Sequence, residues 1–264
     1  MEILVCLKQV PDDLVRIPWD AETQKPATGQ IEPVINAFDT YALEMAARYK
    51  EAHGGRITVC AVGPQSWEHS LKNCLAVGAD AAILFCQPDA EAWQCHVFSE
   101  YFAKAIRHME TENGQPFEMI FCGRESTDTG YGQVAAMLAQ NLDMEMVCDV
   151  IAVDAAEKGV LVRKDTENGY QALEITKPSV LAVIHPGYEP RLPTIKNKIA
   201  ARKAKIPTYT QPEFAGCLED CCINRLGFTH PEIQRTCTKL TGEDHEALIK
   251  QAMAIMTENH AIPE

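Results

Sequence analysis

Short apolar runs alternate with longer amphipathic stretches through the first two thirds of the chain. Each run is bounded by Gly, Pro or Asp and has no polar face, which is typical of strands buried on both sides of a parallel sheet. The runs lie at residues 3–8, 57–62, 82–86, 119–122 and 146–153, and a further run lies at 180–184. We predict that these segments are strands of one sheet.

The stretches between the runs have helical spacing. After a cap at Asn36 or Asp39, apolar residues recur at intervals of three and four positions until Gly54. The same spacing predicts further helices at residues 66–76, 91–111 and 131–141. Repeated strand–helix units with right-handed crossovers form sheets that are covered on both faces.

A hairpin follows the parallel part. Segments 160–163 and 170–175 flank Asn168-Gly169, a dipeptide that favours the tight turn between antiparallel strands. The predicted fold class is therefore α/β: a doubly wound, mostly parallel Rossmann-like sheet with an antiparallel hairpin extension and a C-terminal tail.

The periodicity fades near residue 207 and returns in a short helix at about 243–258. We predict an α/β domain over residues 1–207 and a C-terminal arm over residues 208–264. A tail with little core of its own either packs on a partner subunit or frays.

The charge of the chain limits its partners. Its 264 residues carry a formal net charge of -13, and Lys and Arg concentrate only near residues 191–205. Nucleic-acid binding calls for a basic face, and a membrane helix calls for about 18 or more consecutive apolar residues. Neither feature is present, and the N-terminus has no basic leader. We expect a cytoplasmic protein that binds no nucleic acid and has no membrane span.

The 11 cysteines are scattered, which fits a reducing compartment. Several lie in predicted strands, where a free thiol packs as a small apolar group; these are Cys6, Cys60, Cys86, Cys122 and Cys148. A second group lacks the paired spacing of zinc sites; it comprises Cys217, Cys221, Cys222 and Cys237. We predict free thiols and no metal.

Ligands of doubly wound sheets lie beyond the carboxyl ends of the strands, where the strand order reverses. Three loops occupy that edge here, at residues 7–12, 62–65 and 123–134. Residues 36–39 stand nearby, and both a helix cap and a ligand contact fit them. For His185, at the end of a strand, we favour a structural role over a proton-handling or cofactor-adjacent one.

The loop over residues 123–134 offers the most chemistry. Its glycines permit close approach of the backbone, Ser126, Thr127 and Thr129 offer hydroxyls, and the helix that follows directs its free amides at a ligand. A phosphate or pyrophosphate would suit this loop. The alternative is an ordinary strand-to-helix connection in which Asp128 or Thr129 caps the helix.

Several motifs of nucleotide enzymes are missing. No Gly-x-Gly-x-x-Gly follows the first strand, and the chain has no Walker A loop, no Ser-Gly-Gly stretch of the ATP-pyrophosphatase kind and no nucleophile arrangement around its dispersed histidines. We also expect no phosphate-activating lysine-and-acid pair beside the 123–134 loop. The sequence thus predicts no catalytic side chain.

The segment over residues 187–203 is the most basic part of this acidic chain. Pro190 and Pro193 stiffen it and remove amide donors, so it holds a shape without joining a sheet. We predict a surface loop with an apolar tip, Leu192 or Ile195, above a cationic base. Such a loop suggests a docking surface; its predicted docking residues are Arg191, Leu192, Ile195, Lys196 and Lys198.

Together, five segments resemble the β subunit of electron transfer flavoproteins. They occur in the family's order and span roughly residues 1–207. They are Ile3-Leu4-Val5-Cys6-Leu7-Lys8-Gln9-Val10-Pro11, Asn36-Ala37-Phe38-Asp39, Ala76-Val77-Gly78-Ala79-Asp80, the loop Gly123 to Val134, and Glu189-Pro190-Arg191 leading to Ala200-Ala201-Arg202-Lys203.

The resemblance implies an electron-carrier subunit that pairs with a larger α subunit carrying a redox-active FAD. In this family the β subunit holds AMP in one group and a second FAD in the bifurcating group, where NADH reduces that flavin. The resemblance also implies docking of acyl-CoA dehydrogenase-like or other redox partners, with Ile195 as the anchor. The implied pocket residues are Cys6, Asn36, Ala37, Phe38, Asp39, Val62, Gly123, Arg124, Glu125, Ser126, Thr127, Asp128, Thr129, Gly130, Tyr131, Gly132, Gln133 and Val134.

The 123–134 loop departs from both groups. Its end, Gly130 to Val134, is closer to bifurcating relatives than to the acidic loop of AMP-binding members, but Ala135-Ala136 replaces their Gly-Pro. Tyr131 is bulky where a small polar residue is common, and it either stacks on an aromatic ring or blocks one. We expect FAD, with AMP as the alternative.

Two other functions compete with the electron-transfer interpretation. One is a stand-alone adenine-nucleotide-binding enzyme of the same fold, and the other is a nucleotide-sensing interaction module.

Overall fold

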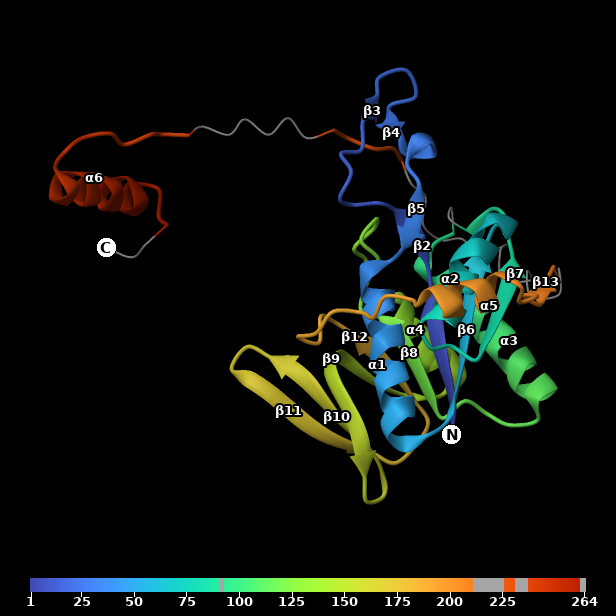
Figure 1. Cartoon of the computed structure of the whole chain (residues 1–264). Helices are drawn as coiled ribbons and strands as arrows, with labels where there is room; N and C mark the ends of the chain where they lie inside the picture. Colours follow the sequence, from blue (N-terminus) through green and yellow to red (C-terminus); the bar gives the residue numbers. More distant parts are fainter. Residues whose placement is uncertain (91–92, 211–225, 231–236, 262–264) are drawn as a thin grey trace. The chain divides into compact units, whose positions relative to one another are not determined.

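Nine strands form one sheet in the part of the chain that the structure describes, residues 1–90, 93–210, 226–230 and 237–261 (Figure 1). The computed structural model orders them β11-β10-β9-β12-β8-β1-β6-β7-β13. Neighbours from β9 to β13 are parallel, whereas β10 is antiparallel to β9 and β11. The bounds are β1 Glu2–Leu7, β6 Arg56–Gly63, β7 Ala81–Cys86, β8 Met119–Gly123, β9 Glu145–Ala156, β10 Gly159–Thr166, β11 Gly169–Ile175, β12 Ser179–Val183 and β13 Thr208–Tyr209.

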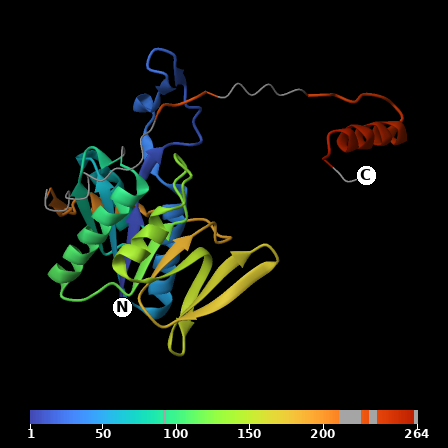
Figure 2. The same cartoon turned by 180° about the vertical axis from the view of Figure 1, so that it is seen from behind.

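Helices cover both faces of this sheet. The helix α1 lies in front of the sheet in Figure 1, and α3 and α4 come to the front in the opposite view of Figure 2. The helices of this part are α1 Ala37–His53, α2 Glu68–Ala76, α3 Cys95–Asn113, α4 Val134–Leu142 and α5 Ile195–Arg202.

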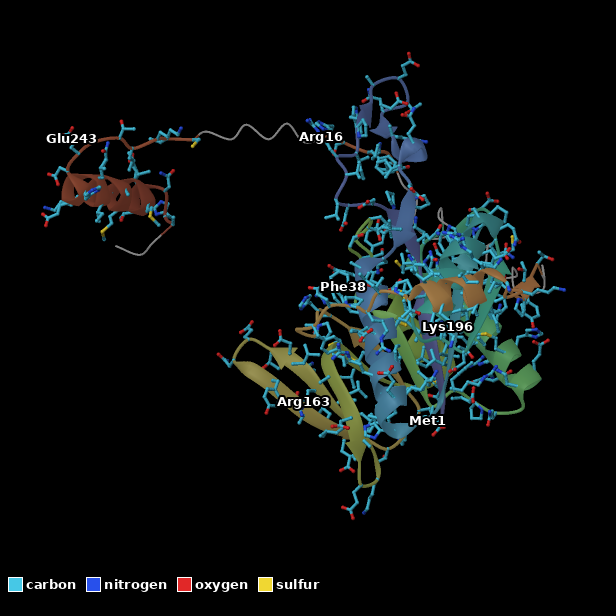
Figure 3. The ribbon with its side chains drawn as sticks, viewed as in Figure 1. Met1, Arg16, Phe38, Arg163, Lys196 and Glu243 are labelled. Carbon is cyan, nitrogen blue, oxygen red and sulfur yellow. The ribbon has the colours of Figure 1, made fainter. Side chains whose placement is uncertain are left out.

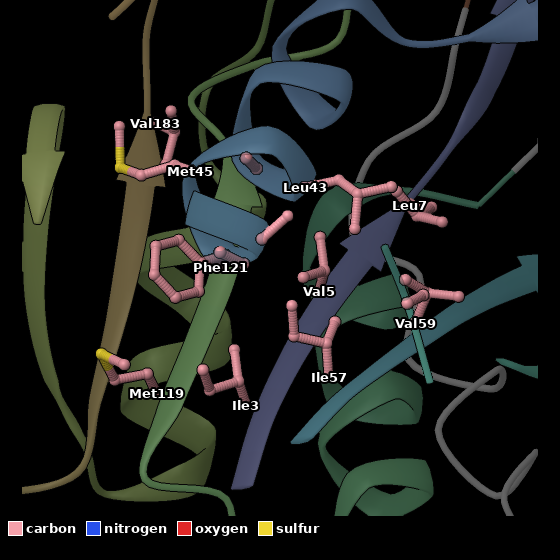
Figure 4. Close-up of a cluster of buried hydrophobic side chains, with 14 of the residues drawn as sticks. Ile3, Val5, Leu7, Leu43, Met45, Ile57, Val59, Met119, Phe121 and Val183 are labelled. Carbon is pink, nitrogen blue, oxygen red and sulfur yellow. The ribbon is translucent and has the colours of Figure 1, made fainter. Parts of the chain in front are cut away.

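Successive residues of β1 serve two separate cores. Ile3, Val5 and Leu7 pack in one core with α1 and α2 (Figure 4). Leu4 and Cys6 pack in the other with α3 and α4. Because every side chain of the strand is buried, the strand shows no polar face in the sequence. The predicted doubly wound α/β sheet with its hairpin is confirmed.

Three helices begin later than the sequence predicts, and one of them, α3, begins at Cys95 rather than at 91. Residues Gln65–Trp67 form a 3₁₀ turn, η2, before α2 begins. The helix α4 begins at Val134 rather than at 131, because Gly130 and Gly132 adopt φ angles of +63° and +61°, which a right-handed helix does not allow.

An arm between β1 and α1 was not predicted. It consists of two small antiparallel pairs, β2 Gln9–Pro11 with β5 Pro33–Ile35 and β3 Trp19–Asp20 with β4 Lys25–Pro26, and a 3₁₀ turn, η1, at Thr28–Gln30. The arm carries exposed apolar side chains, among them Leu14, which is 92% exposed. The strands of this segment are too short to leave a periodic pattern in the sequence. Arg16, which lies in this segment, is labelled in Figure 3.

The segment over residues 187–203 is only in part the loop that we predicted. Its second half is the helix α5, which begins after Thr194, whose hydroxyl accepts a hydrogen bond from the amide of Asn197 at 3.2 Å. Sequence periodicity did not predict this short helix, because it contains three cations and has no continuous apolar stripe. Figure 3 labels Lys196 on its exposed first turn.

The chain divides into two units, Met1–Leu226 and Gly227–Glu264. The second unit contains α6, His245–Glu258, in which Asp244 caps the amides of Glu246 and Ala247. Its exposed apolar residues are Ile249, Met253 and Met256. Within the described residues, no helix has both the length and the apolar character needed to span a membrane.

Described cysteines are free thiols, as predicted. Cys6, Cys60, Cys74 and Cys122 are buried and Cys237 is exposed. The described residues contain no cluster that could hold a metal ion. Three members of the predicted thiol group lie outside the described residues; they are Cys217, Cys221 and Cys222.

Candidate functional site

A cavity opens at the carboxyl ends of β1, β6 and β8, the edge at which the sequence predicts a ligand. The strands supply its floor, the 123–134 loop and the start of α4 one wall, and residues around the start of α3 another. Its lining residues are Cys6, Leu7, Lys8, Asn36, Asp39, Val62, Trp67, Ala90, Trp93, Cys95, Phe98, Phe102, Cys122, Gly123, Arg124, Glu125, Ser126, Thr129, Tyr131, Gly132, Gln133, Val134 and Ala135.

The structure brings most of the predicted pocket residues to this cavity. Five of them do not line it. These five are Ala37, Phe38, Thr127, Asp128 and Gly130. Phe38 instead lies against Gly123, where a Cβ would come within 2.7 Å of the Phe38 Cβ.

The aromatic wall of the cavity was missed by sequence reasoning. Trp67, Trp93, Phe98 and Phe102 line the cavity from segments that the pattern assigned only to helices. One signal was present, because Gly63 ends β6: a Cβ there would lie 2.6 Å from the Trp67 ring, so only glycine lets the indole lie flat on the strand end. This wall is aromatic, and aromatic side chains pack favourably against planar ligands.

Asp39 joins the ends of β1 and β8 to α1. Its Oδ2 accepts a hydrogen bond from the amide of Lys8 at 2.7 Å, and its Oδ1 accepts from the amide of Gly123 at 3.0 Å and from Nδ2 of Asn36 at 3.0 Å. A Cβ at Gly123 would lie 2.3 Å from Oδ1. Burial raises the pKa of Asp39 to about 7, against the hydrogen bonds, which favour the carboxylate.

Asn36 holds the 123–134 loop. It occupies the N-cap position of α1, yet its side chain makes no capping bond. Its Nδ2 donates to the carbonyl of Glu125 at 2.8 Å, and its Oδ1 accepts from the amide of Thr127 at 3.1 Å. The sequence suggested two roles for residues 36–39, a helix cap and a ligand contact. The structure shows a third role, because Asn36 and Asp39 position the loop that lines the cavity.

Lys8 ties the same loop from the other side. Its Nζ donates to Oδ2 of Asp128 at 2.7 Å and to Oγ of Ser126 at 3.3 Å. A lysine-and-acid pair therefore stands beside this loop, with the two side chains bound to each other. The two residues are 120 positions apart, and only the fold brings them together.

The loop is not a helix cap. The N-cap position of α4 belongs to Gln133, and its side chain makes no capping bond, so neither Asp128 nor Thr129 caps this helix. Instead the loop closes on itself: the amide of Gly130 donates to the carbonyl of Ser126 at 2.8 Å, and the hydroxyls of Ser126 and Thr129 lie 2.8 Å apart. Uncapped amides at the start of α4 therefore face the cavity wall.

Arg124 is the second cation of the cavity lining. Its Nη1 lies 2.9 Å from Oε2 of Glu125 and its Nε lies 2.9 Å from Oδ1 of Asp149. Asp149 has a φ of 55°, at a shift of register between β9 and β12. This bulge places its carboxylate against Arg124.

The chemistry of the cavity suits a nucleotide. Helix amides and hydroxyls can receive a phosphate, beside two cations that are each paired with carboxylates, and the aromatic wall can receive a planar ring. The floor includes Cys6, whose burial raises the pKa of its thiol and keeps it uncharged.

A second groove, about 530 Å³ in volume, lies beneath the segment over residues 187–203, against α1 and α2. Leu192 and Ile195 are 90% and 79% exposed. Arg191 does not join them at the surface, because its guanidinium pairs with Glu44 and Glu51 of α1. The predicted cationic base thus retains Lys196 and Lys198, which are exposed.

His185 fits a structural role. Its Nδ1 accepts a hydrogen bond from the amide of Gly187 at 3.1 Å, and its ring lies edge-on to Tyr41 with a centroid distance of 4.8 Å. It is not among the residues that line the cavity.

Comparison with known proteins gives one consistent answer. The family model of the electron transfer flavoprotein domain matches residues 27–214. The chain is 34% identical to the electron transfer flavoprotein subunit beta of Thermoanaerobacterium thermosaccharolyticum over 206 residues, 78% of this chain and 76% of that protein. It is 28% identical to the electron transfer flavoprotein subunit beta of Megasphaera elsdenii over 264 residues, 96% of this chain and 97% of that one. It is also 28% identical to the Caffeyl-CoA reductase-Etf complex subunit CarD of Acetobacterium woodii, over 85% of this chain and 84% of that one.

Proposed function

Since this chain belongs to the electron transfer flavoprotein family as a β-type subunit, we propose that its cavity binds FAD and that residues 187–203 dock a redox partner. The observation that carries the proposal is the cavity itself. Part of its lining is aromatic, and another part offers hydroxyls, two cations and the uncapped start of α4.

The predicted ligand residues divide into two roles in this proposal. Gly123 to Ser126, Thr129 and Tyr131 to Val134 contact the nucleotide. Asn36 and Asp39 hold the loop against β1 and β8 through hydrogen bonds of 2.7–3.1 Å. A bound FAD supplies the isoalloxazine that accepts and releases electrons, whereas the side chains of this subunit bind it, orient it and exclude water.

AMP is the alternative ligand. It would use the same phosphate and ring contacts and would make the site structural. With FAD, NADH becomes the reductant and the protein belongs to the bifurcating type. The name of the Acetobacterium relative places that protein in a complex with caffeyl-CoA reductase, which is a precedent for a dedicated partner enzyme.

The partner that we propose is an α subunit carrying its own FAD. The exposed apolar residues Ile249, Met253 and Met256 of α6 would be buried on that subunit, so the arm over residues 208–264 would pack rather than fray. Dehydrogenases such as acyl-CoA dehydrogenases would bind at Leu192 and Ile195.

The test is the nucleotide content of the complex. The full chain is expressed together with its α subunit, desalted and denatured, and the released nucleotides are quantified. The expected result is two FAD per heterodimer together with oxidation of NADH. One FAD and one AMP per heterodimer would show that this cavity binds AMP instead of FAD. A colourless monomer that hydrolyses ATP would instead favour the stand-alone enzyme, and a colourless monomer that binds a nucleotide without turnover would favour the sensing module.

A further inference from the structure

Tyr131 stands between two glycines in the left-handed conformation. Gly130 and Gly132 have φ angles of +63° and +61°, which other residues rarely adopt. The glycines turn the chain out and back again, so the ring of Tyr131 is 50% exposed while it lines the cavity. This backbone therefore holds a large ring at the mouth of the site.

The inner rings of the cavity differ from this outer ring. Trp93 packs on Tyr101 with a centroid distance of 5.1 Å, and Phe98 packs on Phe102 at 5.5 Å. Tyr131 has neither a ring contact nor a hydrogen bond to any of the described residues. The inner wall is thus fixed by its own packing, whereas the outer ring is free to meet a ligand.

The loop cannot simply fold into the cavity. Its first half is tied to Asn36 and Lys8, and its second half continues into α4. Tyr131 lies between these two fixed parts and moves only about its own side-chain torsions and the two glycines.

The cavity holds rings at two depths. Trp67 and Phe102 of its lining are 4% and 2% exposed, whereas Tyr131 is 50% exposed. A ligand that places one ring system against the buried aromatic wall therefore has its second one near the mouth, where Tyr131 lies.

We propose that Tyr131 is a specificity residue that stacks on the second ring of a flavin dinucleotide and so selects FAD over a mononucleotide. This inference rests on the proposed function. Stacking of an aromatic side chain on a ring is worth about 1 kcal/mol or more, which corresponds to a change in affinity of about five- to tenfold. The sequence left stacking and blocking open; an exposed ring at the rim of the cavity, without a packing partner among the described residues, favours stacking.

The test measures FAD and AMP separately, on the full chain, by calorimetry and by flavin fluorescence. Tyr131→Ala is expected to weaken FAD about five- to tenfold, to leave AMP within about twofold, and to restore flavin fluorescence that the tyrosine quenches. Tyr131→Phe keeps the ring and is expected to match the wild type. Tyr170→Ala removes another exposed tyrosine, on β11 and outside the cavity, and is the control.

Three results would overturn the inference alone. Equal loss of FAD and AMP would make Tyr131 structural, tighter FAD binding in Tyr131→Ala would make it a block, and no change in either would remove it from the site. A wild-type chain that binds neither nucleotide would overturn the proposed function as well. The ratio of FAD to AMP retained by the desalted heterodimer is the second measurement, in case a variant of the isolated chain fails to fold.

Discussion

Arg191 is bound by Glu44, so the segment over residues 187–203 is attached to α1 by an almost buried carboxylate. The Nε of Arg191 donates to Oε2 of Glu44 at 2.7 Å, and the amide of Arg191 donates to the same oxygen at 3.1 Å. The Glu44 side chain is only 3% exposed. Burial alone would raise the pKa of Glu44, but hydrogen bonds from Arg191 and Arg48 hold it below its ordinary value.

The first prediction concerns this ion pair. Arg191→Gln leaves Glu44 with Arg48 as its one remaining cation and is expected to lower the free energy of unfolding by about 1–3 kcal/mol. Lys196→Gln, on the exposed side of the same segment, is the matched control and should change it by less than about 0.5 kcal/mol. Urea unfolding measures both.

The stability difference between the wild type and Arg191→Gln should depend on pH in one direction. Because the folded pKa of Glu44 is lowered, its contribution to stability is present above the unfolded value of 4.5 and is lost as the pH falls through the folded value. The difference between the wild type and Arg191→Gln should therefore shrink below pH 4.5. A constant difference down to acid unfolding would show that Arg191 acts by packing.

The backbone plan was predictable, because local signals carry it. The strands buried on both faces leave unbroken apolar runs, as at Ile3 to Leu7, and Asn168-Gly169 marks the hairpin. The directions of individual side chains were not predictable. The Lys8–Asp128 pair joins residues 120 positions apart, and Arg191 turns inward because α1 places two carboxylates beneath it. Such contacts depend on how distant segments pack together, and the periodicity of the sequence does not predict that packing.

The second prediction concerns the apolar anchor. Ile195 is 79% exposed, and burial of such a side chain on a partner stabilises a complex by about 1.5–3 kcal/mol. Ile195→Ala is therefore expected to raise the KM for a partner dehydrogenase about tenfold and to leave kcat and bound nucleotide unchanged. Ile195→Val should have a smaller effect, and Leu192→Ala tests the other exposed tip. Stopped-flow electron transfer measures all three; loss of flavin in Ile195→Ala would show that the residue supports the fold instead.

The third prediction concerns Asp39. Burial raises its folded pKa to about 7, from 3.8. The folded state therefore holds a proton that the unfolded state releases, and the stability that this proton supplies is present below pH 3.8 and is lost as the pH rises to about 7. At about 1.4 kcal/mol per pKa unit the full effect is a few kcal/mol. Asp39→Asn removes the titration.

Comparison of the wild type with Asp39→Asn isolates this effect from other titrating groups. The stability of the wild type relative to the variant is expected to fall from pH 5 to pH 8 in urea unfolding. Asp13→Asn, an exposed substitution of the same kind, is the control for loss of a carboxylate. A relative stability that rises over this interval would mean that the three N–H donors around Asp39 outweigh its burial.

The fourth prediction concerns the ion pair between Asp128 and Lys8, which attaches the 123–134 loop to the end of β1. Their side chains are 24% and 28% exposed, and pairs of this kind contribute up to about 1 kcal/mol, so loss of the tie should weaken nucleotide binding about two- to fivefold. Asp128→Ala is expected to lower retention of nucleotide by loosening the loop, and Lys8→Gln should do the same.

A double-mutant cycle separates this tie from direct contact with phosphate. If the two residues act only through each other, Lys8→Gln combined with Asp128→Ala should weaken binding no more than either change alone. If Asp128 merely occupies a lysine that would otherwise bind phosphate, Asp128→Ala should tighten binding and Lys8→Gln should abolish the gain. Calorimetry with AMP distinguishes these results, because AMP carries the phosphate without the second ring that Tyr131 would contact. Tighter AMP binding in Asp128→Ala would therefore show that Asp128 competes with the phosphate for Lys8 and does not act by holding the loop.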